Sequence, residues 1–483
     1  MGRLLRAFAL AAVALWASTA WGTTLRVGAG QTYATPCAAA AAAQDGDTIE
    51  IDAGTYAGDF CEWARNSLTI RGVGGRAHLD ATGHTIANEK AIWVIQGNDT
   101  TVENIEFSGA KVPDKNGAGI RQEGPGLTVR NCYFHDNDDG ILAGDSAESD
   151  IVIESSEFAD NGYGDGQSHN FYINHVRSFT LRACWSHRAR IGHLVKSRAL
   201  VNYILYNRLT DETGTASYEI DLPNGGTAYV IGNLVQQSAT TDNSTLVSYG
   251  AEGLTNPDTH LYVVNNTFVN DRTGGGTFVR VAAGAATAVL TNNLFVGPGT
   301  VLEGPGAEQA SLATDSPGLA DRPGYDYHLV AGSPAVNAGV DPGSAGSVAL
   351  GPVFQYVHPL GLEGRSVAGG TIDIGAYELG GGTPIDDGGV ADDGGVADGG
   401  APGDGGGADA ANADGSAHDG GHVADGGGAD GGGADGGGNG GGGGCGCRAT
   451  TTGGAGPGLA ALLALALAGA RRRARRPARR SPR

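Results

Sequence analysis

The sequence predicts an all-β chain wound into a single right-handed parallel β-helix, with about 27 residues and three short strands in each turn. Three observations predict this fold. A six-residue pattern recurs at a regular spacing, its alignment produces a column of asparagines, and glycine, asparagine and aspartate punctuate the apolar runs.

The six-residue pattern returns eight times along the chain. Its copies cover residues 102–107, 129–134, 153–158, 181–186, 204–209, 230–235, 263–268 and 290–295. Their last positions are separated by 27, 24, 28, 23, 26, 33 and 27 residues. This spacing is typical of one three-stranded turn of a parallel β-helix, whereas a βαβ repeat would need a helix-length apolar pattern between the strands.

Alignment of the copies places like residues in columns. The fourth position carries four successive asparagines, Asn207, Asn233, Asn266 and Asn293. Stacked amides can hydrogen-bond along the axis and so satisfy polar groups at a buried turn. The sixth position carries phenylalanines that we expect to stack inward: Phe107, Phe134, Phe158, Phe268 and Phe295.

The same alignment distinguishes the cysteines of the body. Cys132 and Cys184 share a column but lie two turns apart. Two strand spacings amount to about 9.6 Å, which exceeds the reach of a disulfide. We therefore expect two buried single thiols, and we expect the disulfide between Cys37 and Cys61, in an exported and oxidising setting.

The N-terminal residues 1–22 read as a secretory signal peptide. Arg3 and Arg6 form a basic region, residues 7–17 are apolar, and the small residues Ala20 and Gly22 suit cleavage. The alternative, a retained membrane anchor, is disfavoured because the apolar run is short. Residues 23–379 then form the predicted β-helix domain.

Residues 380–444 consist almost entirely of glycine, aspartate and alanine. They lack apolar periodicity and carry a high net charge, so we expect a disordered tether. Cys445 and Cys447 follow, then a short apolar run over residues 456–470 and a cluster of arginines over residues 471–476. The run is shorter than a stable membrane span.

This C-terminal arrangement, residues 445–483, resembles the tripartite sorting signal of myxobacterial surface proteins. The resemblance implies that the signal is processed around Cys445 and Cys447 by envelope sorting machinery. It also implies that the protein is exported and anchored at the outer membrane or cell surface. The alternative is a plain tail anchor, with arginines holding that end in the cytoplasm.

The two ends of the body look capped. Residues 32–43, with their alanine run, read as a short helix over the N-terminal end. Residues 45–51 and 54–56 resemble the opening of pectate-lyase-like β-helix proteins. Residues 333–339 and 373–378 resemble the terminal cap of surface-anchored bacterial β-helix proteins. These resemblances imply a fold far more strongly than a reaction.

The net charge limits the classes of partner. The chain carries −21 at neutral pH, and the body alone carries about −20. Non-specific nucleic-acid binding depends on neutralising phosphates, so we expect no nucleic-acid partner. Tight adsorption to anionic lipid is disfavoured for the same reason, and we expect a monomer.

One segment of this acidic body is basic. Between Asp165 and Asp211 there is no acidic residue, yet the segment holds seven of the 31 lysines and arginines. Its cationic and imidazole side chains are Arg177, Arg182, Arg188, Arg190, Lys196, Arg198 and Arg208, with His169, His175, His187 and His193. A local patch can attract an anion because charges beyond the Debye length are screened.

Three strands of this segment align by pattern, at residues 169–174, 192–198 and 217–221. Side chains alternate faces along a strand, so Val195 and Ile220 are predicted to point inward. Lys196 and Arg198 then point outward. Asn174 is expected beside them on one neighbouring turn, and Glu219 or Asp221 on the other.

Such a face suits β-elimination of a uronate polysaccharide. Arg198, or a Ca²⁺ ion held by Glu219 and Asp221, would neutralise the sugar carboxylate. Lys196 is the candidate base, with His193 or Tyr218 assisting. The candidate substrate-binding residues are Asn174, Tyr172, His169 and Arg190. Known β-helix polysaccharide lyases use lysine and arginine in this way, so the resemblance implies the same roles here.

Other interpretations stay open. The same groove could belong to a non-catalytic glycan-binding or adhesive surface protein, or the basic run could be a solvated face with a Lys196–Asp221 salt bridge. A glycoside hydrolase would need paired carboxylates, which only Glu219 and Asp221 offer near the patch. The acidic run at residues 136–139 is expected to form a turn, and no Cys/His spacing predicts zinc.

Overall fold

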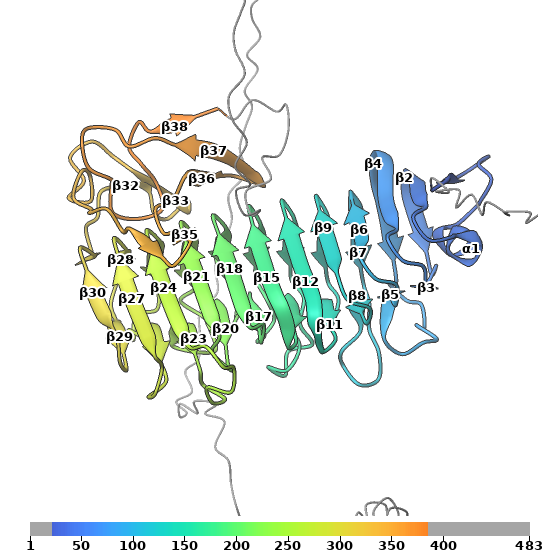
Figure 1. The fold of residues 1–483 in the computed structure, drawn as a ribbon, viewed down its shortest axis with the longest axis horizontal. Coiled ribbons are helices and arrows are strands. Elements are labelled where there is room, and N and C mark those ends of the chain that lie inside the picture. The colour runs from blue at the N-terminus through green and yellow to red at the C-terminus, as the bar shows by residue number, and fades with distance from the viewer. Residues whose placement is uncertain (1–21, 385–483) are drawn as a thin grey trace, which may run out of the picture. The chain divides into compact units, whose positions relative to one another are not determined.

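A computed structural model of the chain describes residues 22–384. The predicted leader, most of the Asp/Gly tract and the predicted sorting signal with Cys445 and Cys447 lie outside the described residues. Within them, successive turns stack in a row along one axis, as Figure 1 shows. No helix in this part of the chain is long and apolar enough to cross a membrane.

Each turn contributes three strands, as predicted, and the stacked turns form three faces of parallel strands. Face 1 consists of β3 (Cys61–Trp63), β5 (Ala91–Ile95), β8 (Ala118–Gln122), β11 (Asp139–Ala143), β14 (Phe171–Ile173), β17 (Lys196–Ser197), β20 (Ile220–Leu222), β23 (Thr245–Tyr249), β26 (Thr277–Val281) and β29 (Thr300–Glu303).

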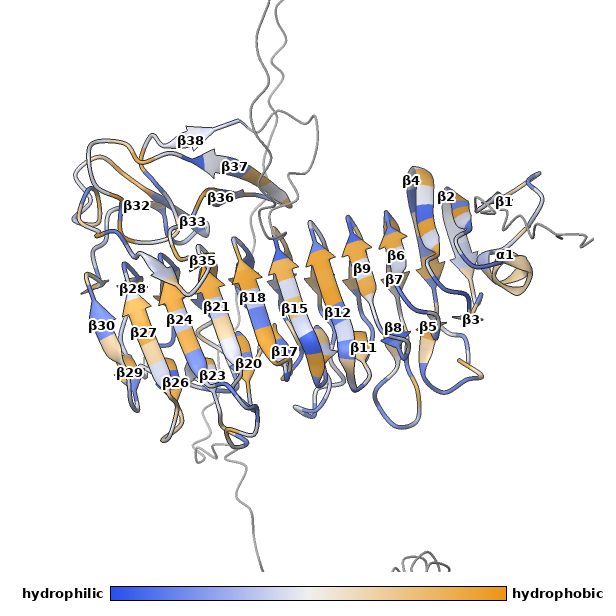
Figure 2. Cartoon of the chain, viewed as in Figure 1, coloured by the Kyte–Doolittle hydropathy of each residue, from blue (hydrophilic) through white to orange (hydrophobic). Residues whose placement is uncertain are grey.

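Face 2 consists of β1 (Thr24–Val27), the first halves of β2 (Thr48–Ala57) and β4 (Thr69–Asp80), and β6 (Thr100–Glu103), β9 (Leu127–Arg130), β12 (Ser146–Glu154), β15 (Val176–Arg182), β18 (Val201–Leu205), β21 (Thr227–Ile231), β24 (His260–Val264), β27 (Thr287–Thr291) and β30 (Ala307–Gln309). Figure 2 shows hydrophobic and hydrophilic residues along the same strands of this face. That pattern is typical of strands with one side buried.

Face 3 consists of the second halves of β2 and β4, and β7 (Ile105–Ser108), β10 (Tyr133–His135), β13 (Glu157–Ala159), β16 (Trp185–His187), β19 (Arg208–Thr210), β22 (Leu234–Gln237), β25 (Thr267–Asn270), β28 (Leu294–Val296) and β31 (Leu312–Thr314). Each strand on every face pairs in parallel with the strand one turn away.

The aligned columns of the sequence are columns in space. Phe134 pairs in register with Phe107 on one side and with Phe158 on the other. The three rings stack with centroids 4.8 Å apart. Phe268 and Phe295 stack in the same way, 5.2 Å apart. These rings are fully buried, so the column forms part of the hydrophobic core.

The asparagine column is a continuous hydrogen-bonded ladder. The side-chain Nδ2 of Asn207 donates to Oδ1 of Asn233, and that of Asn233 donates to Oδ1 of Asn266, over 3.0 and 2.9 Å. Asn266 continues the ladder to Asn293 over 3.0 Å. All four side chains are fully buried. The ladder therefore satisfies polar groups at the corner between faces 2 and 3 that burial would otherwise leave unpaired.

A second ladder, of alternating charge, runs along the outside of face 2. The in-register column reads Arg26, Glu50, Arg71, Glu103, Arg130, Glu154 and Arg182. Five of its neighbouring pairs lie between 2.6 and 3.5 Å apart. Opposite charges directly across parallel strands favour this register over a slipped one.

The closing segment contains β32 (Leu319–Asp321), β33 (Asp326–Leu329), β34 (Ser344–Ala345), β35 (Val348–Ala349), β36 (Phe354–Val357), β37 (Gly361–Arg365) and β38 (Gly382–Thr383). It lies along the side of the stacked turns, as the orange ribbon in Figure 1 shows. The side chains of Asn265 and Asn292 donate to its carbonyls at Asp373 and Val340. The predicted terminal cap is thus a lateral cover, and much of the last turn stays exposed.

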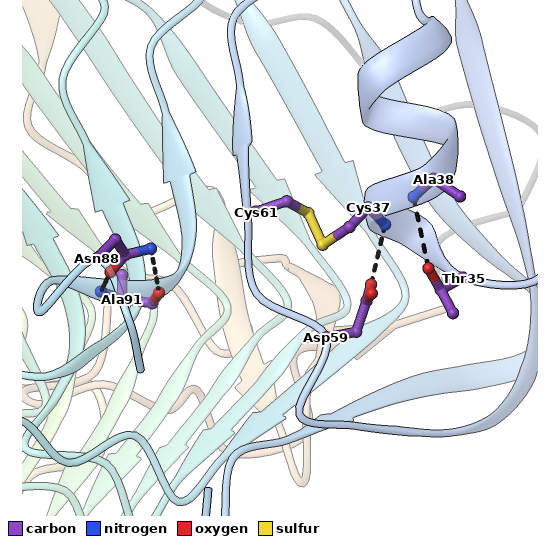
Figure 3. Close-up of a disulfide and its surroundings, with 7 residues drawn as sticks. All are labelled: Thr35, Cys37, Ala38, Asp59, Cys61, Asn88 and Ala91. Atoms are coloured by element: carbon purple, nitrogen blue, oxygen red, sulfur yellow. Dashed lines mark hydrogen bonds between the residues drawn. A yellow bond between two sulfur atoms is a disulfide. The ribbon is translucent and has the colours of Figure 1, made fainter. Parts of the chain in front are cut away.

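A helix covers the other end. α1 (Pro36–Ala42) is shorter than the predicted residues 32–43, because Thr35 caps its N-terminus and Pro36 begins it. The predicted disulfide joins Cys37 in this helix to Cys61 in β3, with Cα atoms 5.3 Å apart (Figure 3). Cys132 and Cys184 are buried free thiols, as predicted, and burial raises the pKa of each to about 12.

The asparagine ladder makes a quantitative prediction. Asn233→Ala removes the acceptor of Asn207 and the donor to the carbonyl of Ile204. Each buried polar group left unpaired costs about 1–3 kcal/mol, so we expect the free energy of unfolding in urea to fall by about 3 kcal/mol or more. The exposed Asn98→Ala should change it by less than about 0.5 kcal/mol. Equal effects of the two substitutions would contradict the role of the ladder.

Candidate functional site

The outward column of face 1 carries the residues that the sequence singled out. Tyr172 in β14 pairs with Lys196 in β17, and Lys196 pairs with Asp221 in β20. Val195 and Ile220 are fully buried, so their predicted inward orientation is confirmed. Lys196 projects outward, although only 13% of its side chain is exposed.

Arg198 follows β17 directly and its guanidinium has three partners. Nε donates to the hydroxyl of Tyr172 over 2.7 Å, and Nη1 donates to Oδ1 of Asn224. Nη2 donates to Oε2 of Glu252 over 2.6 Å. The guanidinium is therefore fixed from three turns and cannot swing freely.

Lys196 shares one of these partners. Its Nζ lies 3.4 Å from Oε1 of Glu252 and 3.6 Å from Oδ2 of Asp221. Nζ of Lys196 and the guanidinium carbon of Arg198 both lie over the ring of Tyr172, 5.7 and 5.6 Å from its centroid. These five side chains, Tyr172, Lys196, Arg198, Asp221 and Glu252, are called the carboxylate clamp below.

Glu252 is the member that sequence reasoning missed. It lies in the loop between β23 and β24, more than 50 residues from both cations. Its side chain is 48% exposed, and one oxygen faces each cation. Although burial raises its pKa, the hydrogen bond from Arg198 and the charge of Lys196 hold it below the ordinary value. A loop residue of this kind carries no repeat signal.

Asp221 is the other carboxylate of the clamp, and it is almost completely buried. Burial raises its pKa to about 6, against the opposing charge of Lys196. Its Oδ1 atom has no hydrogen-bond partner among the described residues. A carboxyl group with a pKa near neutral can both accept and donate a proton under physiological conditions.

His169 and His193 lie behind the clamp and stack with centroids 4.5 Å apart. The backbone N–H of His193 donates to Nδ1 of His169, and the N–H of Tyr218 donates to Nδ1 of His193. Burial lowers the pKa of both imidazoles well below the ordinary value, so both are neutral. The two histidines therefore form a cross-turn ladder, in which Nε2 of His193 lies 3.6 Å from Asp221.

Glu219 does not join the clamp, because Asp221 is the one of the two candidate carboxylates that pairs with Lys196. It is fully buried, and neither carboxyl oxygen has a hydrogen-bond partner in the described part of the chain. Burial raises its pKa well above the ordinary value, and the nearby charge of Asp211 adds to the effect. The acid is thus held protonated, and it presents no carboxyl oxygen to solvent.

Two of the predicted substrate-binding residues interact with other groups of the protein. Arg190 forms an ion pair with Asp136, which directly follows β10 on face 3. Its side chain therefore does not reach the clamp on face 1. The side-chain oxygen of Asn174 accepts from the N–H of its neighbour His175 over 2.9 Å. Tyr172, by contrast, lies directly beside Lys196 on the neighbouring turn.

A cavity of about 440 Å³ lies apart from the clamp, between the coil and the closing segment. Glu212, Asp271, Arg322 and Tyr325 contribute to its lining. Arg322 and Gln236 bind the carboxylate of Asp271 over 2.8 and 2.9 Å. Because the Asp271 carboxylate is already hydrogen-bonded on both oxygens, the cavity does not supply the two available carboxyl groups that a glycoside hydrolase needs.

Comparisons with known proteins identify the fold. Residues 67–235 match the family model described as a right-handed β-helix region. The crystal structure of pectate lyase Pel9A aligns with a TM-score of 0.50 and 13% identity, over 74% of this chain and 96% of that chain. The chain is therefore a right-handed parallel β-helix of the kind that a pectate lyase uses.

Two further solved structures align less closely. A protein of Geobacillus virus E2, ORF18, has a TM-score of 0.35 and 13% identity, over 56% of this chain and 54% of that chain. A mutant of the PL6 family alginate lyase AlyGC has a TM-score of 0.34 and 16% identity, over 61% of this chain and 40% of that chain. No curated protein matches the sequence.

The buried carboxyl groups predict an unusual pH dependence of stability. Burial raises the folded-state pKa of Asp221 to about 6, above its ordinary value of 3.8. The folded state therefore binds this proton more tightly, so its stabilising contribution is complete below about pH 4 and is lost as the pH rises towards 6. Urea unfolding at pH 4, 5 and 6 should show a shallower decline for Asp221→Asn than for the wild type. Parallel declines would contradict the assignment.

Proposed function

We propose that the protein binds an acidic polysaccharide of the uronate class at the carboxylate clamp. The observation that carries this proposal is the position of Glu252, whose carboxylate is held by Lys196 and Arg198 together. Two cationic side chains, in and directly after β17, thus already bind a carboxylate on the outer side of face 1. A sugar carboxylate that replaced Glu252 would meet the same two cations.

The exchange is energetically accessible. Glu252 is half-exposed on a loop, and ion pairs at exposed positions contribute about 0–1 kcal/mol each. Gly250 and Gly253 flank it with positive φ values of 80° and 103°. Arg198, in contrast, keeps its hydrogen bonds to Tyr172 and Asn224 when Glu252 leaves. The receiving side of the clamp is therefore preorganised, while the resident carboxylate is replaceable.

Tyr172 supports a carbohydrate ligand in particular. Its ring lies beneath both cations, and its hydroxyl is bound by Arg198. An aromatic face beside a carboxylate-binding pair matches a sugar ring that has an apolar face and an acidic substituent.

Cleavage by β-elimination is the second candidate function, and the pKa of Asp221 near 6 favours it. Arg198 would neutralise the sugar carboxylate, and Lys196 in its uncharged form would take the C5 proton. The C4–O glycosidic bond would then break, and the protonated Asp221 carboxyl would give its proton to the leaving oxygen. Any calcium requirement would fall on Asp221 and Glu252, because Glu219 is fully buried. The burial of Asp221 beneath Lys196 favours binding without turnover as the primary role.

Export and surface anchoring are part of the same proposal. The disulfide between Cys37 and Cys61 supports an oxidising compartment. The proposed leader and sorting signal lie outside the described residues.

Surface anchoring can be tested with protease added to intact cells. The wild-type chain should be cleaved, because it would be exposed at the surface. We expect the double substitution Cys445→Ala with Cys447→Ala to leave the chain protected inside or release it to the medium. Unchanged surface exposure of this variant would show that the two cysteines are not needed for processing.

The clamp predicts a specific pattern of affinities for polygalacturonate and alginate. Hydrogen bonds to charged groups contribute about 1.5–3 kcal/mol, so Lys196→Ala and Arg198→Ala should each weaken binding about 10- to 100-fold. Glu252→Gln removes the competing charge and should strengthen binding by up to about fivefold. Isothermal titration calorimetry measures all three, with a neutral glucan as control ligand.

Arg177→Ala is the matched control variant, because Arg177 is an exposed arginine on face 2 whose partner is Asp150. Its affinity should equal that of the wild type. If Glu252→Gln weakened binding as much as Arg198→Ala does, Glu252 would be a ligand-binding residue and the replacement model would fail. Ultraviolet absorbance of the unsaturated product then separates turnover from binding alone.

A further inference from the structure

A second group of chemically reactive side chains lies on the outer surface of face 3, apart from the clamp on face 1. His78 comes from β4, Glu106 from β7 and His135 from β10, which are adjacent turns. Their side chains are 26%, 26% and 20% exposed. The group is thus rigidly placed by three paired strands and still open to solvent.

The three potential ligand atoms converge. Nε2 of His135 lies 3.1 Å from Oε1 of Glu106, and Nε2 of His78 lies 3.6 Å from the same oxygen. The three side chains can present ligand atoms that all lie within 4.8 Å of one another. A tetrahedral ion with metal–ligand distances of about 2.0–2.1 Å holds its ligands about 3.3 Å apart. The observed separations fit such an ion with small rotamer changes.

The other ring nitrogen of His135 is also occupied. Its Nδ1 lies 3.0 Å from Oδ2 of Asp136, so the imidazole stands between two carboxylates. Asp136 is itself held by Arg190. This is the arrangement in which Nδ1–H donates to a carboxylate and the Nε2 lone pair is left for a metal. It gives Arg190, which does not reach the clamp, a role in orienting Asp136.

The surroundings of His78 complete the group. Its Nε2 lies 2.7 Å from the hydroxyl of Ser108, which also approaches Asp80. Tyr133 stacks on the ring of His135, with centroids 4.4 Å apart, and limits its rotation. The ring of His135 is therefore oriented before an ion arrives, whereas Nε2 of His78 would exchange its hydrogen bond with Ser108 for the metal.

We propose that His78, Glu106 and His135 form a binding site for a divalent transition-metal ion, with Zn²⁺ as the best match. Two imidazoles and one carboxylate suit zinc, whereas calcium takes six to eight oxygen ligands. Three protein ligands and a solvent-exposed side leave a fourth position for water or for an oxygen of a ligand. The site is independent of the carboxylate clamp and of the function proposed for it.

The experiment is Zn²⁺ titration of the full-length chain by isothermal calorimetry, after alkylation of its thiols so that cysteines do not contribute. The wild type should bind one ion more than the double variant His78→Ala with His135→Ala. Asp136→Asn should retain the ion but bind it about 10- to 100-fold more weakly. Zn²⁺ should also raise the Tm of the wild type and leave that of the double variant unchanged.

His175→Ala is the control, because His175 is an exposed histidine that faces a single carboxylate, Asp145. It should bind Zn²⁺ as the wild type does. Equal Zn²⁺ binding by the double variant and the wild type would overturn the proposal. Ca²⁺ binding at this site as tight as that of Zn²⁺ would also overturn it. So would the absence of Zn²⁺ binding by the wild type, because the three side chains would then form only cross-strand hydrogen bonds.

Discussion

Parallel pairing between successive turns is the constraint from which the sites of this protein follow. It sets residues that are 18 to 33 positions apart in sequence directly opposite one another, as with Tyr172, Lys196 and Asp221. A slip of one residue would turn each outward side chain into the core. Two ladders oppose such a slip, the buried asparagines at one corner and the alternating arginines and glutamates on face 2. Chemistry on the outer faces depends on this register.

The same constraint explains which features could be predicted from the sequence. A periodic pattern reveals its own period, so the coil, the phenylalanine column and the outward orientation of Lys196 follow from alignment alone. These features depend on strands, where the alternation of side chains is regular.

Features at corners and in loops escaped the sequence, for physical reasons. Glu219 lies just before β20, where the chain bends and an apparently outward residue is buried. Glu252 belongs to a loop that no repeat describes. His78, Glu106 and His135 lie on strands and were missed for another reason: they are 28 and 29 residues apart, a spacing that matches no local zinc motif and becomes meaningful only as one turn of the coil. The closing segment has its own strands, so the repeat did not reveal its lateral position.

The proposed ligand-binding role depends on one idea, that the carboxylate of Glu252 occupies the place of a ligand carboxylate. A crystal structure of the protein with a bound uronate oligosaccharide tests it directly. We expect a sugar carboxylate between Nζ of Lys196 and the guanidinium of Arg198, with the Glu252 side chain displaced and the Tyr172 ring beneath the sugar. A sugar bound elsewhere, with Glu252 still paired to both cations, would contradict it.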